Sequence, residues 1–215
     1  MFRTYIKYIA YLILIVGFSS ARAGAYEDFF KAITQDDART VAGLLERGFD
    51  PNSRDEKGQT PLYLGLREGA FKSAALLLAH PQTRIDLANA VGETALMMAA
   101  LKGHTDWVQQ LLDRGARPEG ADPTAWTALH YAASGPDTRT VALLLARGAL
   151  PNARSPNGST PLMMASRYGP EASADALLQK GADPKLRNQA DLSAADFAKL
   201  AGREALADRL RLAAR

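Results

Sequence analysis

A repeat of about 33 residues constrains this sequence more than any other feature. A motif of Thr or Ser, then Pro or Ala, then an apolar residue starts at Thr60, Thr94, Thr127, Thr160 and Ser193. Successive starts are therefore 34, 33, 33 and 33 residues apart, and a degenerate first copy begins at Glu27. Fourteen residues after each start stands Val or Ala, and a Leu pair follows at plus 17 and plus 18 in five copies. This i, i+3, i+4 spacing predicts one apolar helical face in the second half of every copy.

Each copy also carries signals for where its helices begin and end. A Thr hydroxyl at the start can cap the free amides of a first helix, and Pro61 and Pro161 fit the first helical position, where no amide donor is missed. A glycine at plus 21 ends the second helix in four copies, and Pro81 replaces it in one. Turns centred on Lys57-Gly58, Val91-Gly92 and Asn157-Gly158 then reverse the chain as hairpins.

A single copy cannot fold alone. Ordering each residue costs about 1–2 kcal/mol in backbone entropy, whereas burying a Leu or Val side chain returns about 1.5–3 kcal/mol. Stacking of neighbouring copies is therefore obligatory. The pairs Ala99-Ala100 and Ala132-Ala133 leave little bulk on the first helices, so adjacent copies can approach closely. We expect an all-α solenoid.

The motif resembles the ankyrin repeat. The copies that carry the resemblance best are Thr127-Ala-Leu-His-Tyr-Ala-Ala and Thr94-Ala-Leu-Met-Met-Ala-Ala-Leu-Lys-Gly-His104. The resemblance covers about residues 26–215 and implies stacked antiparallel helix pairs with β-hairpin-like loops and a concave face that binds protein partners. Three departures stand out: Pro136 occupies the usual Gly of its copy, residues 81–93 carry one extra residue, and the last copy is short.

These observations predict the domain organisation. Residues 1–23 form a signal peptide, and residues 24–215 form the ankyrin-repeat domain. The repeats within it cover approximately residues 26–59 (an N-terminal cap), 60–93, 94–126, 127–159, 160–192 and 193–215 (a C-terminal cap).

The first 23 residues are typical of an export signal. Arg3 and Lys7 precede an uncharged, mostly apolar run over 8–21, and Ala21-Arg22-Ala23 supplies a small-x-small cleavage site. The run of 14 residues is shorter than the ~18–20 that a membrane-spanning helix needs. We predict cleavage after Ala23 and a periplasmic or secreted protein; the alternative is an uncleaved anchor that tethers the same domain to the membrane. The sequence has no Cys, so no disulfide is available.

The charge balance argues against a nucleic-acid partner. Without the first 23 residues the chain has 23 basic and 23 acidic residues, whereas phosphate binding requires clustered Lys and Arg. The two halves differ: residues 24–137 hold 11 basic and 16 acidic residues, and residues 138–215 hold 12 and 7. This difference can orient a partner.

The sequence offers little for catalysis, metal binding or a cofactor. His130 falls on the repeat's own His, which in this family ties the helix-start Thr to a neighbouring loop. His104 opens a second helix and His80 ends one, so we interpret all three as structural. No Gly-x-Ser-x-Gly motif or phosphate-binding loop is present. We interpret Met97, Met98, Met163 and Met164 as core residues.

One enzymatic alternative stays open at this stage. Carboxylates such as Asp55, Glu56, Glu68 and Glu93 could cluster because equivalent positions of successive repeats stack, which would suit a paired-acid glycosidase. A shallow groove, however, lacks the enclosure that raises a carboxyl pKa. We therefore predict no enzyme activity and no small-molecule substrate.

The family geometry predicts the partner-binding surface. It consists of residues just before each helix start and of those seven and eight after it. The offsets select Glu56, Lys57, Gln59, Arg67, Glu68, Glu93, Leu101, Lys102, Trp126, Ser134, Pro156, Asn157, Ser159, Arg167 and Tyr168. Trp126 is the predicted anchor, with the alternative that it only covers its own loop. We expect Trp107, which opens a second helix, to pack on a neighbouring repeat.

Together these features predict a monomeric, non-catalytic scaffold of the bacterial periplasm with an unidentified protein partner. The membrane enters only through an uncleaved signal. Periplasmic ankyrin proteins of this layout are associated with protection from peroxide through a catalase, which the resemblance implies as a refinement. The alternative is an exported effector or a toxin-neutralising ankyrin protein that acts on host or rival-cell proteins.

Overall fold

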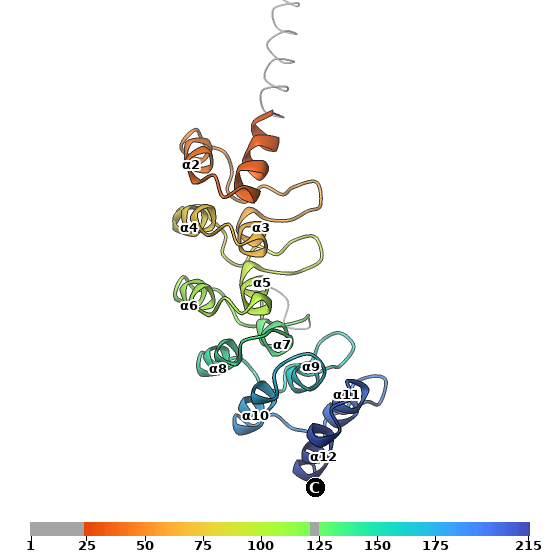
Figure 1. Cartoon of the computed structure of the whole chain (residues 1–215). Coiled ribbons are helices and arrows are strands. Elements are labelled where there is room, and N and C mark those ends of the chain that lie inside the picture. Colours follow the sequence, from red (N-terminus) through yellow and green to blue (C-terminus); the bar gives the residue numbers. More distant parts are fainter. Residues whose placement is uncertain (1–23, 121–124) are drawn as a thin grey trace, which may run out of the picture.

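The computed structural model describes residues 24–120 and 125–215, and over these residues the chain forms a stack of antiparallel helix pairs (Figure 1). The first helices of the pairs are residues 24–34, α3 (Pro61–Glu68), α5 (Ala95–Lys102), α7 (Ala128–Ser134), α9 (Pro161–Arg167) and α11 (Ala194–Leu200). The second helices are α2 (Ala38–Glu46), α4 (Phe71–Ala79), α6 (Thr105–Asp113), α8 (Thr138–Ala146), α10 (Glu171–Gln179) and α12 (Glu204–Ala213). The predicted all-α solenoid is confirmed. The proposed signal peptide lies outside the described residues.

The helices pack in two columns. The first helices α3, α5, α7, α9 and α11 each contact the next in order, and among the second helices α2 contacts α4, α6 contacts α8 and α8 contacts α10. The array is curved, and α9 to α12 lie off the line that α2 to α8 follow (Figure 1). No helix in the described parts of the chain is long and apolar enough to span a membrane.

Local signals start most first helices as expected. The hydroxyl of Thr94 accepts a hydrogen bond from the Met97 amide at 3.3 Å, and the Thr160 hydroxyl accepts one from the Met163 amide at 3.4 Å. Thr60 is a correction, since its side chain makes no cap hydrogen bond and Pro61 begins that helix.

The second helices end as the glycine pattern predicts. The four glycines at plus 21 have φ between 84° and 90°: Gly48, Gly115, Gly148 and Gly181. The copy with Pro81 ends its second helix without a glycine. There the Thr83 hydroxyl, which lies beyond the end of α4, donates to the Leu77 carbonyl at 2.6 Å.

The loop that contains Pro136 also departs from its neighbours. In α3 and α5 the first helix ends on a left-handed glycine, whereas Gly135 after α7 is extended, with φ −82°. A Cβ at Gly135 would lie 2.8 Å from the Leu101 carbonyl oxygen, and one at Gly169 in the next copy would lie 2.1 Å from the Ala133 carbonyl oxygen. Glycine therefore lets each loop contact the backbone of the preceding copy.

The core is one continuous cluster along the whole stack. The Ala pairs of α5 and α7 are completely buried, which confirms that small residues let the first helices approach closely. The four methionines predicted to be core residues are also buried: Met97, Met98, Met163 and Met164. The sulfur atoms of Met97 and Met163 each accept an amide hydrogen bond at 3.4 Å, from Thr94 and Thr160.

Candidate protein-binding surface

Projecting loops connect each copy to the next, and we call them fingers. Those described in full cover residues 55–59, 89–93, 155–159 and 188–192. In each, the amide of the first residue donates to the carbonyl of the last, at 2.7–3.0 Å. Neighbouring fingers are joined, since the Ala90 amide donates to the Gly58 carbonyl at 3.1 Å and the Gln189 amide donates to the Asn157 carbonyl at 3.0 Å. The fingers lie along one side of the stack (Figure 1), and each of these two contacts braces one pair of neighbouring fingers.

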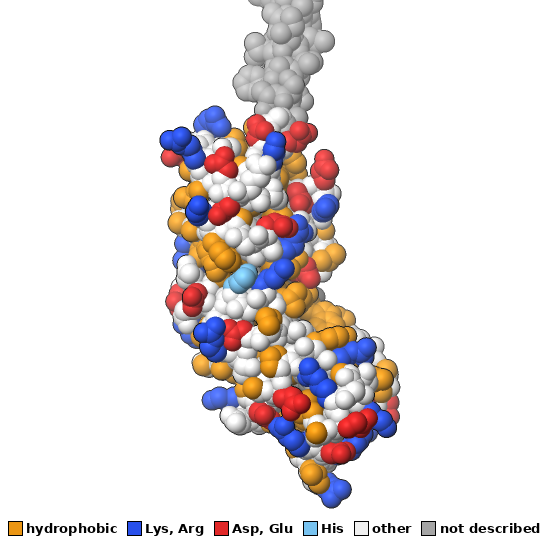
Figure 2. Space-filling model, in the orientation of Figure 1, with side chains coloured by type: hydrophobic (Ala, Val, Ile, Leu, Met, Phe, Trp, Pro, Cys, Tyr) orange, Lys and Arg blue, Asp and Glu red, His pale blue; other side chains and the backbone are white. Residues whose placement is uncertain are grey.

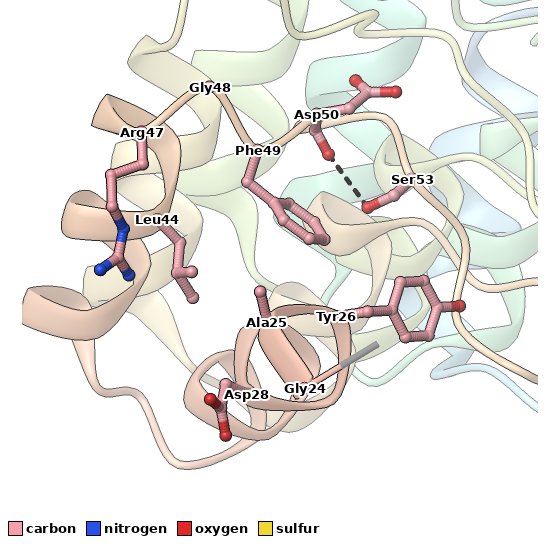
Figure 3. Close-up of a pocket in the computed structure, with 10 residues that line it drawn as sticks. All are labelled: Gly24, Ala25, Tyr26, Asp28, Leu44, Arg47, Gly48, Phe49, Asp50 and Ser53. Atoms are coloured by element: carbon pink, nitrogen blue, oxygen red, sulfur yellow. Dashed lines mark hydrogen bonds between the residues drawn. The ribbon is translucent and has the colours of Figure 1, made fainter. Parts of the chain in front are cut away.

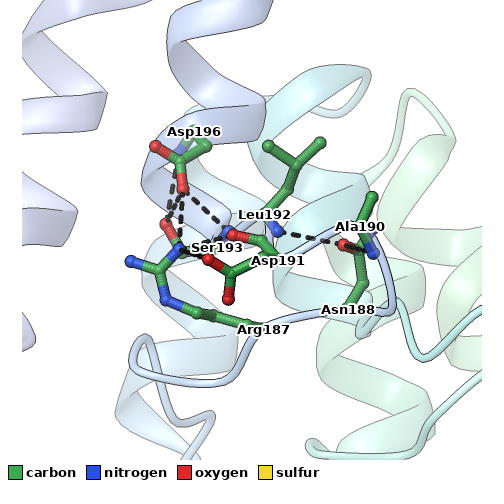
Figure 4. Close-up of polar contacts among 7 residues, drawn as sticks. All are labelled: Arg187, Asn188, Ala190, Asp191, Leu192, Ser193 and Asp196. Carbon is green, nitrogen blue, oxygen red and sulfur yellow. Dashed lines mark hydrogen bonds and ion pairs between the residues drawn. The ribbon is translucent and has the colours of Figure 1, made fainter.

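The last finger is braced by charge as well (Figure 4). The Arg187 guanidinium lies 3.6 Å from the Asp191 carboxylate and 3.7 Å from that of Asp196. Asp196 also accepts from the amide and hydroxyl of Ser193, at 2.9 and 2.6 Å. These hydrogen bonds from Ser193 lower the pKa of Asp196 below its usual range, and the positive charges of Arg187 and Arg211 lower it further. Partial burial opposes the shift.

The predicted surface residues differ in exposure. Exposed side chains are those of Glu56, Lys57, Glu68, Lys102, Pro156, Asn157 and Tyr168. Half-buried side chains are those of Gln59, Arg67, Glu93, Leu101, Trp126, Ser134 and Arg167. Ser159 was predicted at the surface and is instead fully buried, because its carbonyl accepts hydrogen bonds from inside the stack.

Glu93, at the base of its finger, connects copy 60–93 to copy 127–159. Its carboxylate accepts from the Tyr63 hydroxyl of α3 at 2.6 Å, from the Asn89 amide at 3.0 Å, and from the Tyr131 hydroxyl of α7 at 2.9 Å. Burial would raise the pKa of Glu93, but these three hydrogen bonds together lower it. Burial and the Glu93 contact raise the pKa of both tyrosines, so the cluster contains one carboxylate and two phenols at neutral pH.

Neither tyrosine is among the residues predicted from the sequence. They stand at plus 3 and plus 4 of their copies, and the first occupies the position where the family has His. Both positions are usually buried, so the hydroxyl of a tyrosine there was a signal in the sequence that a buried polar partner lies nearby.

His130 ties the start of its helix to the finger at residues 155–159, as the resemblance implied. It is 1% exposed; its Nδ1 accepts from the Thr127 amide at 3.2 Å, and its Nε2 donates to the Ser159 carbonyl at 3.0 Å. The acceptor role of Nδ1 places the proton on Nε2. Burial lowers the pKa of His130 to about 4, so the ring is neutral in the native protein.

Trp126 lies against this histidine. The two ring centroids are 5.2 Å apart at an interplanar angle of 75°, an edge-to-face contact across the boundary between two copies. Trp126 is half-buried and packs on the core. The half-buried indole therefore suits both predicted roles of Trp126, which are to cover its own loop and to anchor a partner.

Trp107 packs on a neighbouring copy, as predicted. Its ring stacks on that of Phe71 at 5.6 Å and 22°, and Phe71 also contacts the edge of His104 at 5.0 Å. Apolar side chains gather over this part of α4 and α6 (Figure 2). A shallow hollow of about 470 Å³ lies beside them and is also lined by Arg139. His104 and His80 cap α6 and α4 as expected.

A second hollow, of about 1020 Å³, lies at the first copy (Figure 3). Tyr26 and Phe49 lie on one side of it. Leu44, in α2, and Arg47, just after the end of α2, lie on the other side. It adjoins Gly24, where the described chain begins.

Three of the four carboxylates considered for glycosidase chemistry make contacts within the fold. Asp55 accepts the amides of Lys57 and Gln59 at 2.9 and 2.7 Å within its finger, Glu68 binds Arg67, and Glu93 binds the two tyrosines. Glu56 is exposed. Within residues 24–120 and 125–215, no three His, Asp or Glu side chains come together in a way that could hold a metal ion.

A family model for ankyrin repeats, three copies at a time, matches residues 29–122 and 117–188. The chain belongs to the ankyrin-repeat family. Proteins of this family are typically protein-interaction modules without catalytic activity.

Similarity to curated relatives covers less than half of the chain. NF-kappa-B inhibitor alpha of Sus scrofa is 31% identical over 97 residues, which is 43% of this chain and 31% of the relative. Human neurogenic locus notch homolog protein 4 is 39% identical over 69 residues, 32% of this chain and 3% of the relative. The chain therefore spans about a third or less of these proteins.

Two solved structures match most of the chain. One is a chain in the complex of the Bd0816 predatory endopeptidase from Bdellovibrio bacteriovorus with immunity protein Bd3460, with TM-score 0.73, 32% identity and coverage of 86% of this chain and 97% of that one. The other is an ankyrin repeat domain from Acinetobacter baumannii, with TM-score 0.71, 23% identity and coverage of 86% and 96%. The second likeness concerns the fold alone.

Proposed function

We propose that this protein is an exported, non-catalytic binding protein that holds one protein partner through its concave face and fingers. The braced fingers support a binding role, because surfaces that are rigid before contact lose little entropy on association. The predicted signal sequence supports a partner in the periplasm or outside the cell.

We further propose that the partner is a hydrolytic enzyme and that binding neutralises it. The observation that carries this proposal is the likeness to a chain of the endopeptidase–immunity complex, at 32% identity over 97% of that chain. The toxin-neutralising alternative from the sequence thereby becomes the leading hypothesis, ahead of a general periplasmic scaffold.

Crosslinking in the native cells tests the partner. The full-length chain carries a C-terminal affinity tag, the cells are treated with a membrane-permeant crosslinker, and the recovered partners are identified by mass spectrometry. We expect one dominant protein of the hydrolase class whose activity falls when the purified chain is added at equal concentration. Recovery of no protein, or of an enzyme whose activity does not change, would contradict the proposal.

The export proposal has its own test. Sequencing the N-terminus of the protein purified from the producing cells is expected to start at Gly24, because cleavage follows Ala23. A protein that starts at Met1 and sediments with membranes would support the uncleaved anchor instead. The refinement involving peroxide is tested by comparing peroxide survival and catalase activity in cells with and without the protein.

A further inference from the structure

Two arginines occupy the same place in different copies, and their surroundings differ. Arg67 and Arg167 each stand seven residues after the start of their copy, in the last turn of a first helix. Arg67 is neutralised by the next residue, since its Nε lies 2.7 Å from Glu68 Oε1. The copy of Arg167 has Tyr168 in the place of Glu68.

Tyr168 changes what the guanidinium contacts. The central carbon of the Arg167 guanidinium lies 5.3 Å from the Tyr168 ring centroid and 6.0 Å from the ring centroid of Phe197 in α11. Among the described residues no carboxylate lies within ion-pair distance of Arg167, so aromatic rings rather than an acid hold it. Stacking orders the guanidinium through its faces and leaves the N–H groups on its edges able to donate.

The neighbourhood of Arg167 is fixed and partly apolar. Arg203 donates to the carbonyl oxygens of Ala165 and Gly169 at 3.3 and 2.6 Å, so another cation already satisfies the end of α9. Tyr168 is 58% exposed. Leu200, at the position of Arg167 one copy later on the adjoining α11, is 59% exposed. The ordered cation thus has one exposed apolar side chain next to it, Tyr168, and another at the equivalent position of the next copy, Leu200.

The charge of the surrounding half favours an anion. Residues 138–215 hold 12 basic and 7 acidic residues, and residues 24–137 hold 11 and 16. A field of this sign attracts an acidic group to the second half of the stack and repels it from the first. Arginine and tyrosine are also the residue types that dominate interface energies.

We propose that Arg167, with Tyr168 next to it and Leu200 at the equivalent position of the next copy, is an anchor for an Asp or Glu side chain on the protein partner. The partner's carboxylate accepts from the free edge of the guanidinium, and an apolar residue next to it packs on Tyr168 and Leu200. This inference rests on the proposed function and specifies the chemistry of the partner.

A pair of short peptides probes the anchor directly. One is an acetylated and amidated peptide of alternating Leu and Glu with a central Phe, and the other has Gln in place of every Glu. Binding to the isotope-labelled protein is followed by NMR, where the Arg167 side-chain N–H is observed. We expect the Glu peptide to shift this signal and to bind at least about tenfold more tightly than the Gln peptide.

Three variants distinguish the anchor from general charge attraction. Arg167→Gln is expected to weaken binding of the Glu peptide about tenfold. Tyr168→Glu should weaken it similarly, because it recreates the internal pair of Arg67 and Glu68. Lys180→Gln is the control, because it removes one positive charge from the same half of the stack, at the end of α10 and outside the predicted surface. It should leave binding unchanged, and unchanged thermal unfolding shows that each variant is folded.

Equal binding of the two peptides, binding of neither, or equal losses in Lys180→Gln and Arg167→Gln would overturn the inference. Its failure is separable from failure of the proposed function. If the crosslinked partner binds the Arg167→Gln variant as tightly as the native protein, the anchor is wrong and the binding function stands. If the Glu peptide binds at Arg167 and crosslinking recovers no protein, the reverse holds.

Discussion

The bridge made by His130 predicts how stability depends on pH. The pKa of its imidazole is about 4 in the folded protein against an ordinary value of 6.5, because burial disfavours the charged ring. As pH falls, the unfolded chain takes up the proton first. The contribution of the neutral ring is therefore fully present above about pH 6.5 and is lost progressively towards about pH 4. Between about pH 7 and about pH 5 this loss amounts to about 2 kcal/mol.

His130→Met isolates this contribution, because the protein already has Met97 and Met163 at the equivalent positions. The Met sulfur can accept the Thr127 amide as its equivalents do, and the Ser159 carbonyl still accepts from the Ser155 amide at 3.0 Å. At about pH 7 the variant should be less stable by about 1 kcal/mol, the value of one lost hydrogen bond. At about pH 5 it should be more stable than the native protein by about 1 kcal/mol.

Urea unfolding monitored by circular dichroism at the two pH values measures the effect. His104→Gln is the control for the other histidine with a lowered pKa. Burial and Lys102 lower the pKa of the half-buried His104, so this variant measures how much of the pH dependence His104 contributes. Parallel pH dependence in the native protein and in His130→Met, with no crossing of their stabilities, would refute the reasoning.

Two further predictions concern contacts between copies, and urea unfolding checks both. Glu93→Gln should destabilise the protein by about 1 kcal/mol at neutral pH, because two tyrosine hydroxyls lose a charged acceptor; an unchanged midpoint would argue against the Glu93 cluster. Gly169→Ala should destabilise it by about 2–3 kcal/mol, since the new Cβ would lie 2.1 Å from the Ala133 carbonyl oxygen. Gly148→Ala, where nothing lies within 4 Å but φ is +90°, should lose only about 1 kcal/mol, and equal losses would contradict this ordering.

The sequence alone determined the organisation within each copy. Residues a few positions apart on one helix have distances fixed by the helix itself, so the Leu pairs identified the buried face and glycines such as Gly148 identified helix ends. The role of His130 could also be anticipated, but only because the family resemblance supplied its partner.

Contacts between copies were decided by the tertiary structure. Glu93 contacts Tyr63 and Tyr131, respectively 30 and 38 positions away, because stacking brings the end of copy 60–93 close to α3 and to α7 of copy 127–159. Arg67 and Arg167 share one position in the repeat, and their neighbours leave the first paired and the second stacked on rings. Periodicity specifies which positions face each other. The fit between adjacent copies and the side-chain rotamers available there decide which atoms touch, and no local spacing encodes either.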